Sequence, residues 1–147
     1  MGQAARLIPL QLNLILNAWH TAASINHVHS QEQIMDKIST DSPHSIRDLN
    51  DQLRVHGRGG RVMLTVGIQA LGAVKIRKIM EEIAKFNNFT EDNDPYSEHD
   101  FGKVIVDGIK VLWKIDYYDQ NLEFGSPDPS DPKLTTRILT VMCSDEY

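Results

Sequence analysis

The feature that most constrains this chain is an Asp-Gly pair between two β-branched runs. Asp107 and Gly108 separate the apolar residues 104–106 from 109–113. Both central residues of a type I′ turn need positive φ, so Asp-Gly in this setting predicts a two-residue β-hairpin. A loop of this length fixes the pairing register, with residue 106 opposite residue 109. The core face of the hairpin is then expected to hold Val104, Val106, Ile109, Val111, Trp113, Ile115 and Tyr117.

The same register predicts what lies at the open end of the hairpin. Followed outward, it sets His99 opposite Asp116, Asp100 opposite Ile115 and Glu98 opposite Tyr117. The second face of the hairpin is expected to carry Lys103, Lys110, Lys114 and Asp116, with Phe101 and Leu112 among them.

Apolar spacing elsewhere completes the expected fold. Helical spacing over 46–55, with Ser45 as N-cap, and over 76–86 predicts two amphipathic helices. We expect strands at residues 61–66 and 137–143, and we expect residues 67–72 to form a connection. Strands that follow one another without crossover helices favour an antiparallel sheet. We therefore expect an α+β domain over 45–147: an antiparallel sheet of about four strands with helices packed on one face, preceded by an N-terminal helical extension over 1–44.

The N-terminal extension contains an apolar stretch at residues 7–16, interrupted by Gln11 and Asn13. Arg6 alone precedes it, which makes a poor signal peptide, and the stretch is too short to span a membrane. Residues 10–19 are expected to form an amphipathic helix that packs on the domain or on a second copy. The latter would give a homodimer through residues 7–19.

Charge is unevenly distributed along the chain. Residues 44–90 contain eight basic and four acidic side chains, whereas residues 91–147 contain five basic and thirteen acidic ones, and the net charge is −5. The acidic half argues against direct binding of nucleic acid over the whole surface and permits a partner with a basic groove. The alternative is a solvated surface that binds no partner. Cys143 is the sole cysteine, which excludes an internal disulfide and fits a cytoplasmic protein.

Several motifs resemble one known family. These are residues 99–102, 113–119, 125–129 and 136–140, with 59–65 and 93–96 upstream. In this order they resemble the bacterial domain-of-unknown-function family DUF3768 over about residues 45–147. The resemblance implies a short cytoplasmic protein carried on plasmids and other mobile elements, and it implies no activity. It also implies glycine after Tyr96, where this chain has Ser97, so the backbone there is expected to differ.

The open end of the hairpin is the best candidate for acid–base chemistry. A carboxylate opposite a histidine can orient the imidazole and raise its basicity, as a general base requires. Asp116 could hold His99 while Glu98 or Tyr118 handles a proton. The alternative is a cross-strand ion pair that only completes the sheet.

The other motifs give little support for a metal-binding or phosphate-binding site. The loop at 92–103 departs from the calcium-binding pattern at its fifth, sixth and twelfth positions, and His27 and His29 lack acidic or cysteine partners at ligand spacing. The glycine-rich run 57–60 is followed by a strand, so it is not a P-loop. We expect no metal and no cofactor.

The sequence favours a binding module over an enzyme. We expect an acidic surface to engage a basic, nucleic-acid-handling protein, and the implied mobile-element setting points to an inhibitor of a bacterial defence nuclease, such as an anti-CRISPR or anti-restriction protein. A small hydrolase using His99 and Asp116 is one alternative, and an accessory subunit that assembles through the N-terminal helix is another. The carboxylates expected to contact the partner are Glu91, Asp92, Asp94, Asp116, Asp119, Glu123, Asp128 and Asp131.

Overall fold

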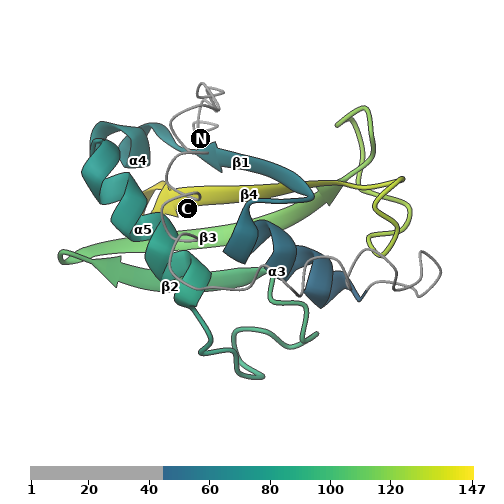
Figure 1. Ribbon diagram of the computed structural model, residues 1–147, viewed down its shortest axis with the longest axis horizontal. Helices are drawn as coiled ribbons and strands as arrows, with labels where there is room; N and C mark the ends of the chain where they lie inside the picture. Colours follow the sequence, from purple (N-terminus) through teal and green to yellow (C-terminus); the bar gives the residue numbers. More distant parts are fainter. Residues whose placement is uncertain (1–44) are drawn as a thin grey trace, which may run out of the picture.

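The computed structural model describes residues 45–147, which form a four-stranded sheet with its helices packed against one face (Figure 1). The helices are α3 (Ile46–His56), α4 (Val66–Ala70) and α5 (Ala73–Lys85). The strands are β1 (Gly60–Leu64), β2 (Phe101–Val106), β3 (Ile109–Tyr118) and β4 (Thr136–Cys143), followed by the 3₁₀ turn η1 (Ser144–Glu146). The predicted α+β architecture is confirmed, and the predicted elements of residues 1–44 lie outside the described residues.

The hairpin forms with the expected register. Val106 pairs with Ile109 and Val104 with Val111, and Asp107 and Gly108 have φ of 49° and 80°. One prediction about the sheet was wrong, because the sheet is mixed. The strand order is β1-β4-β3-β2, and β1 runs parallel to β4 while the other pairs are antiparallel.

The chain path explains the mixed sheet. After β1 the chain forms α4, which the sequence analysis had taken as a plain connection, and then α5, which crosses the sheet and leads to β2 at the opposite edge. This crossover carries the chain past β4 and β3 to the far edge of the sheet, so β2 is not a neighbour of β1. β1 therefore pairs with the last strand, β4.

The core lies between the helices and one face of the sheet. Its centre is Trp113 on β3, which is fully buried. Gly102 pairs with Trp113 across the hairpin, and a Cβ at Gly102 would lie 2.6 Å from the indole ring. The core is completed by Leu53, Leu64, Ile68, Ile79, Ile83, Val111, Leu139 and Val141, each at most 2% exposed.

The C-terminal turn is held by Glu146. Its carboxylate accepts hydrogen bonds from the Thr65 hydroxyl at 2.6 Å and from the backbone N–H groups of Cys143 and Gly67 at 2.8 and 2.9 Å. Desolvation opposes ionisation of Glu146, but these bonds outweigh it and hold its pKa below the usual value. Burial, with the carboxylates of Glu146 and Asp145, raises the pKa of the half-buried Cys143 thiol, which disfavours the reactive thiolate.

Candidate functional site

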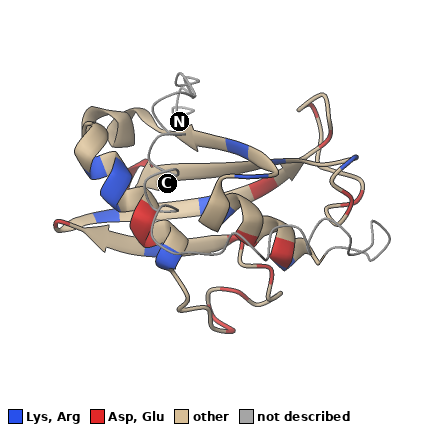
Figure 2. Ribbon diagram, in the orientation of Figure 1, with Lys and Arg blue, Asp and Glu red and all other residues tan. Residues whose placement is uncertain are grey.

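Two acidic loops are joined to strands at the same end of the sheet. The first, residues 86–100, leads into β2, and the second, residues 119–135, joins β3 to β4. Because β3 is antiparallel to both neighbours, the start of β2, the end of β3 and the start of β4 lie at the same end. Together the loops contain nine carboxylates and a single lysine, Lys133. In Figure 2 several acidic residues, coloured red on the ribbon, lie in these two loops.

The same loops expose large apolar side chains. Tyr96 is 83% exposed and Phe124 is 71% exposed, and Leu122 and Leu134 are exposed as well. Aromatic side chains are enriched at protein–protein interfaces, where they supply contact area at little entropic cost. This end of the molecule therefore combines negative charge with aromatic groups that residues 45–147 leave uncovered.

Some of the predicted carboxylates hold the loops themselves. Asp94 is buried, and its carboxylate accepts the backbone N–H groups of Glu98 at 2.8 Å and His99 at 3.2 Å. Asp119, Asp128 and Asp131 each accept a backbone N–H two to four residues further along the chain. Hydrogen bonding of ionised carboxylates to local N–H groups is the usual stabilisation of such turns.

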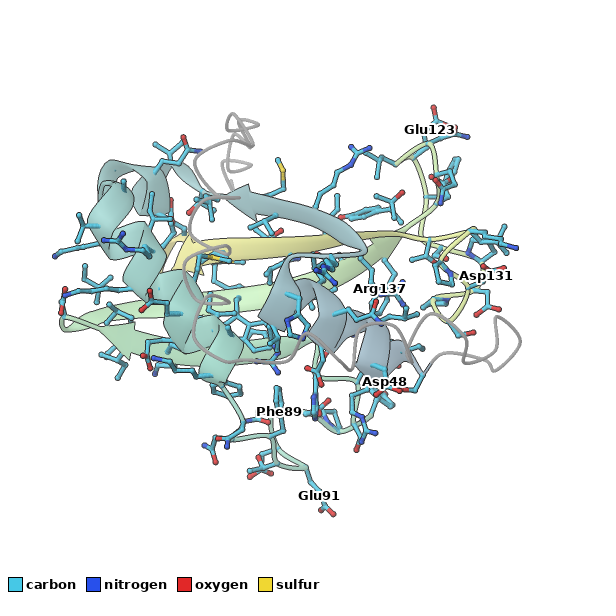
Figure 3. The ribbon with its side chains drawn as sticks, in the orientation of Figure 1. Asp48, Phe89, Glu91, Glu123, Asp131 and Arg137 are labelled. Atoms are coloured by element: carbon cyan, nitrogen blue, oxygen red, sulfur yellow. The ribbon has the colours of Figure 1, made fainter. Side chains whose placement is uncertain are left out.

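Three of the predicted carboxylates accept no such backbone hydrogen bond within residues 45–147. Glu91, Asp92 and Glu123 are exposed and accept no hydrogen bond from the described residues. Figure 3 shows Glu91 on the first loop, and Glu123 and Asp131 on the second, pointing away from the body of the domain.

His99 does not pair with Asp116 as predicted. The His99 Nδ1 lies 3.0 Å from an oxygen of Asp51 on α3, and Asp116 instead pairs with Lys114 at 2.9 Å. The reason is a break in strand geometry, because Ser97 and His99 both have φ of 55°, outside the β region. The left-handed φ at Ser97 is the conformation that glycine favours, which accounts for the glycine that the resemblance implies at this position.

Counted back from the hairpin turn toward the N-terminus, the strand register holds as far as Asp100 and is lost at His99. Ile115 donates its N–H to the Asp100 carbonyl at 2.7 Å, as predicted. Burial, with the nearby Glu98, Asp94 and Asp116, raises the pKa of the Asp100 carboxyl although its backbone hydrogen bond opposes this.

Several groups hold the His99 ring in place. The ring stacks on Phe89, with centroids 3.7 Å apart and planes within 5°. Its Nε2 lies 3.9 Å from Asp94. The Asp51 carboxylate that faces Nδ1 is in turn bound by Arg54 at 2.7 Å. His99 and Phe89 line a hollow of about 710 Å³ together with Arg47, Thr90, Glu91, Asp94, Pro95 and Ser97.

A second buried network lies beneath the first loop. The Asn50 side-chain amide donates to the Tyr117 hydroxyl at 2.7 Å and to the Glu98 carbonyl at 2.8 Å. Tyr117 donates to the Glu98 carboxylate at 3.1 Å, so the predicted proximity of Glu98 and Tyr117 is confirmed. Arg137 donates to the Asn50 oxygen at 3.0 Å and to the Pro129 carbonyl, which ties the second loop to α3.

Burial sets the electrostatics of this network. Desolvation raises the pKa of the Tyr117 phenol well above its usual value and lowers the pKa of the Arg137 guanidinium. Arg137 lies 5.4 Å above the Tyr117 ring, an attraction that compensates part of its lost hydration. The network fixes both loops at the acidic end.

The predicted catalytic candidates are split between the two faces of the sheet. Glu98 and His99 contact residues of α3, on the helix side. Asp116 and Tyr118 alternate with the core-facing Ile115 and Tyr117 on β3, so they lie on the opposite face. Within residues 45–147, no group of three or more His, Cys, Asp or Glu side chains is arranged to hold a metal ion.

The sequence analysis missed the contribution of α3. Asn50, Asp51 and Arg54 supply the polar contacts of both networks. A signal was present: Asn50 and Arg54 occupy the same helical stripe as the core residues Leu49 and Leu53 and are themselves buried. Polar residues on an apolar stripe need buried partners, and long-range partners are what the structure supplies.

Comparison with known proteins identifies a family and no function. A family described as "Protein of unknown function (DUF3768)" matches residues 64–146, more than half of the chain, and the chain belongs to this family. The matched range begins later than the resemblance from residue 45. No curated protein and no solved structure matches the chain. Among residues 45–147 there is no helix with the length and apolarity needed to cross a membrane.

Proposed function

We propose that this member of the DUF3768 family is a protein-binding module that presents its acidic, aromatic end to a basic protein surface. One observation carries the proposal: the two loops that the sheet brings together hold nine carboxylates and one lysine, with Tyr96 and Phe124 exposed among them. Charge of one sign speeds encounter with a partner of the opposite sign, and exposed aromatic groups supply apolar contact.

The proposed partner is a protein that handles nucleic acid. Channels for nucleic acid are lined with lysine and arginine, so they complement a surface of this charge. The mobile-element setting implied by the family resemblance favours a nuclease of a bacterial defence system, which the protein would inhibit by occupying its channel in the cytoplasm.

We propose that the exposed carboxylates among those named in the sequence analysis are the ones that contact the partner. Glu91, Asp92 and Glu123 are the strongest candidates because their carboxylates are exposed. Asp119, Asp128 and Asp131 contribute charge while holding the loops. Asp94 is left out because it is buried, and Asp116 because it lies on the sheet face opposite the helices, paired with Lys114.

Charge reversal tests the proposal. The triple variant Glu91→Lys, Asp92→Lys, Glu123→Lys is expected to bind at least about tenfold more weakly to the partner recovered by the wild type from bacterial extract, because like charges would then face each other. Wild-type binding is expected to weaken from about 0.05 M to about 0.5 M salt, since salt screens exposed charges. The measurement is a tagged pull-down with mass spectrometry, followed by titration of the purified partner.

The matched control changes the net charge equally elsewhere. Glu81→Lys, Glu82→Lys and Asp145→Lys lie on α5 and in the C-terminal turn, outside both acidic loops. This control should bind like the wild type. Equal binding by both triple variants, or no stoichiometric partner at either salt concentration, would refute the proposal.

The contacts of His99 support a second candidate function, acid–base catalysis. Asp51 faces Nδ1 at 3.0 Å, and the ring borders the hollow beside Phe89. A carboxylate that accepts the Nδ1–H orients the imidazole, and Nε2 is then able to accept a proton from a hydrolytic water. In this candidate Asp51 takes the role that the sequence analysis gave to Asp116.

The catalytic candidate is tested with a panel of hydrolase substrates. If it is right, His99→Gln and Asp51→Asn each lower turnover by at least about 100-fold, the usual scale for losing a general base or its support. His56→Gln, an exposed histidine at the end of α3, is the control and should keep full activity. Absence of turnover by the wild type across the panel removes this candidate and leaves the binding module.

A further inference from the structure

The second face of the sheet carries apolar side chains on all four strands, together with charged ones such as the Lys114–Asp116 pair on β3. Strand register places side chains on the face opposite the core wherever their neighbours point inward. Met63 pairs with Thr140, Thr140 with Lys114, and Lys114 with Phe101, which makes one row across the sheet. The apolar members of this open face are Met63, Phe101, Ile105, Leu112, Ile138 and Met142.

Residues 45–147 cover this open face only in part, since Met142 is 4% exposed while Met63, Phe101, Leu112 and Ile138 are partly exposed. All three described helices pack on the other side (Figure 1). Ile105 is 61% exposed, and Tyr147, itself 78% exposed, packs against Phe101 with ring centroids 6.4 Å apart. A contiguous apolar patch on a sheet face is normally covered by another segment or by a partner.

We propose that residues 10–19 of the same chain dock on this open face. Residues 10–19 contain leucines at 10, 12, 14 and 16, with Ile15 and Trp19, and no charged side chain. An uncharged apolar segment matches the apolar members of the face, beside the Lys114–Asp116 ion pair on β3, and Lys103, Lys110 and Arg61 of the same face extend their charged ends into solvent.

Chain length permits this docking. The described structure begins at Ser45, the N-cap of α3. Residues 20–44 span up to about 80 Å when extended, whereas a domain of this size has a radius of gyration of about 13 Å. A tethered segment has an effective concentration of about millimolar, which favours it over an equivalent segment of a second copy.

Cysteine pairing tests the docking in the full-length chain. In a Cys143→Ser background, Leu14→Cys with Ile105→Cys should form an intramolecular disulfide at least about tenfold faster than Leu14→Cys with Val74→Cys, because a disulfide needs close Cβ atoms. Val74 is a matched control, since it is 60% exposed and lies on α5, on the other side of the sheet. Equal rates, or a disulfide-linked dimer as the main product with Ile105→Cys, would overturn the proposal, and the dimer would make a second copy the occupant.

Methionine oxidation gives a second readout that needs no added cysteine. The full-length variant Leu12→Asp, Leu14→Asp, Leu16→Asp should expose Met63 on the open face and raise its rate of oxidation by peroxide severalfold. Met80 in the core is the internal reference and should be unchanged. Identical Met63 oxidation in the wild type and the variant would contradict docking on this face.

Discussion

Replacing Arg54 by alanine is expected to lower the free energy of unfolding by about 3–5 kcal/mol, the usual cost of removing one partner from a buried ion pair. Arg54 is 4% exposed and donates to the carbonyls of Ile83, Ala84 and Phe86 at 2.6, 3.2 and 3.0 Å. These carbonyls lie at the C-terminal end of α5, where intrahelical donors are lacking.

The loss of Arg54 would also affect the acidic end of the domain. Its guanidinium binds Asp51 at 2.7 Å and lies 5.4 Å from the centre of the Phe89 ring. Asp51 in turn faces His99. Removing Arg54 therefore leaves a half-buried carboxylate without its cation and weakens the support of the first acidic loop.

Two further variants make the Arg54 prediction specific. Arg54→Lys should recover less than half of the loss, because an ammonium group cannot reach several carbonyls and a carboxylate with one planar fork. Arg77→Ala, an exposed arginine on α5, should change the free energy of unfolding by about 0.5 kcal/mol or less. Urea denaturation of the full-length chain measures all three, and a loss below about 1 kcal/mol for Arg54→Ala would refute the assigned role.

Replacing Gly102 by alanine is expected to cost about 2–3 kcal/mol, near the upper end of the usual range for overpacking a core. The new Cβ would lie 2.6 to 2.7 Å from three atoms of the Trp113 indole. Trp113 has no solvent-exposed surface, and it packs edge-on against Phe86 with ring centroids 5.7 Å apart. The indole therefore has no room to move aside.

A double-mutant cycle separates this contact from a backbone effect of alanine. In a Trp113→Phe background the smaller side chain lacks the indole atoms Cζ2, Cε2 and Nε1 that the new Cβ would meet, so Gly102→Ala should cost about 1 kcal/mol or less there. Urea denaturation of the four proteins gives the coupling energy between the two positions. A cost that is equal in both backgrounds would show that contact with Trp113 is not the cause.

The hairpin was predictable because its determinants are local. The turn conformation of Asp107 and Gly108 sets the pairing of β2 and β3, and alternation then assigns the core face. The same holds for α3, where Ser45 caps the helix by accepting the N–H of Asp48 at 3.1 Å, and for the amphipathic α5. In each case the deciding residues lie within one or two turns of one another.

The arrangement of these elements was not predictable in the same way. The parallel pairing of β1 with β4 depends on which sheet edge remains free after α5 has crossed to β2. The partner of His99 depends on two residues with left-handed φ, Ser97 and His99, which end the ladder before the register can reach Asp116.

From the sequence alone, α3 and α5, the hairpin register, the concentration of acidic residues in the second half and the family could be predicted, whereas α4 could not. Only the tertiary structure decided that two acidic loops share one end of the sheet, and that Asn50, Asp51 and Arg54 of α3 hold them. The physical reason is range: backbone conformation and periodicity act over a few residues, whereas the contact between Asp51 and His99 joins groups 48 residues apart. Such a contact exists only after the core has packed α3 against the sheet.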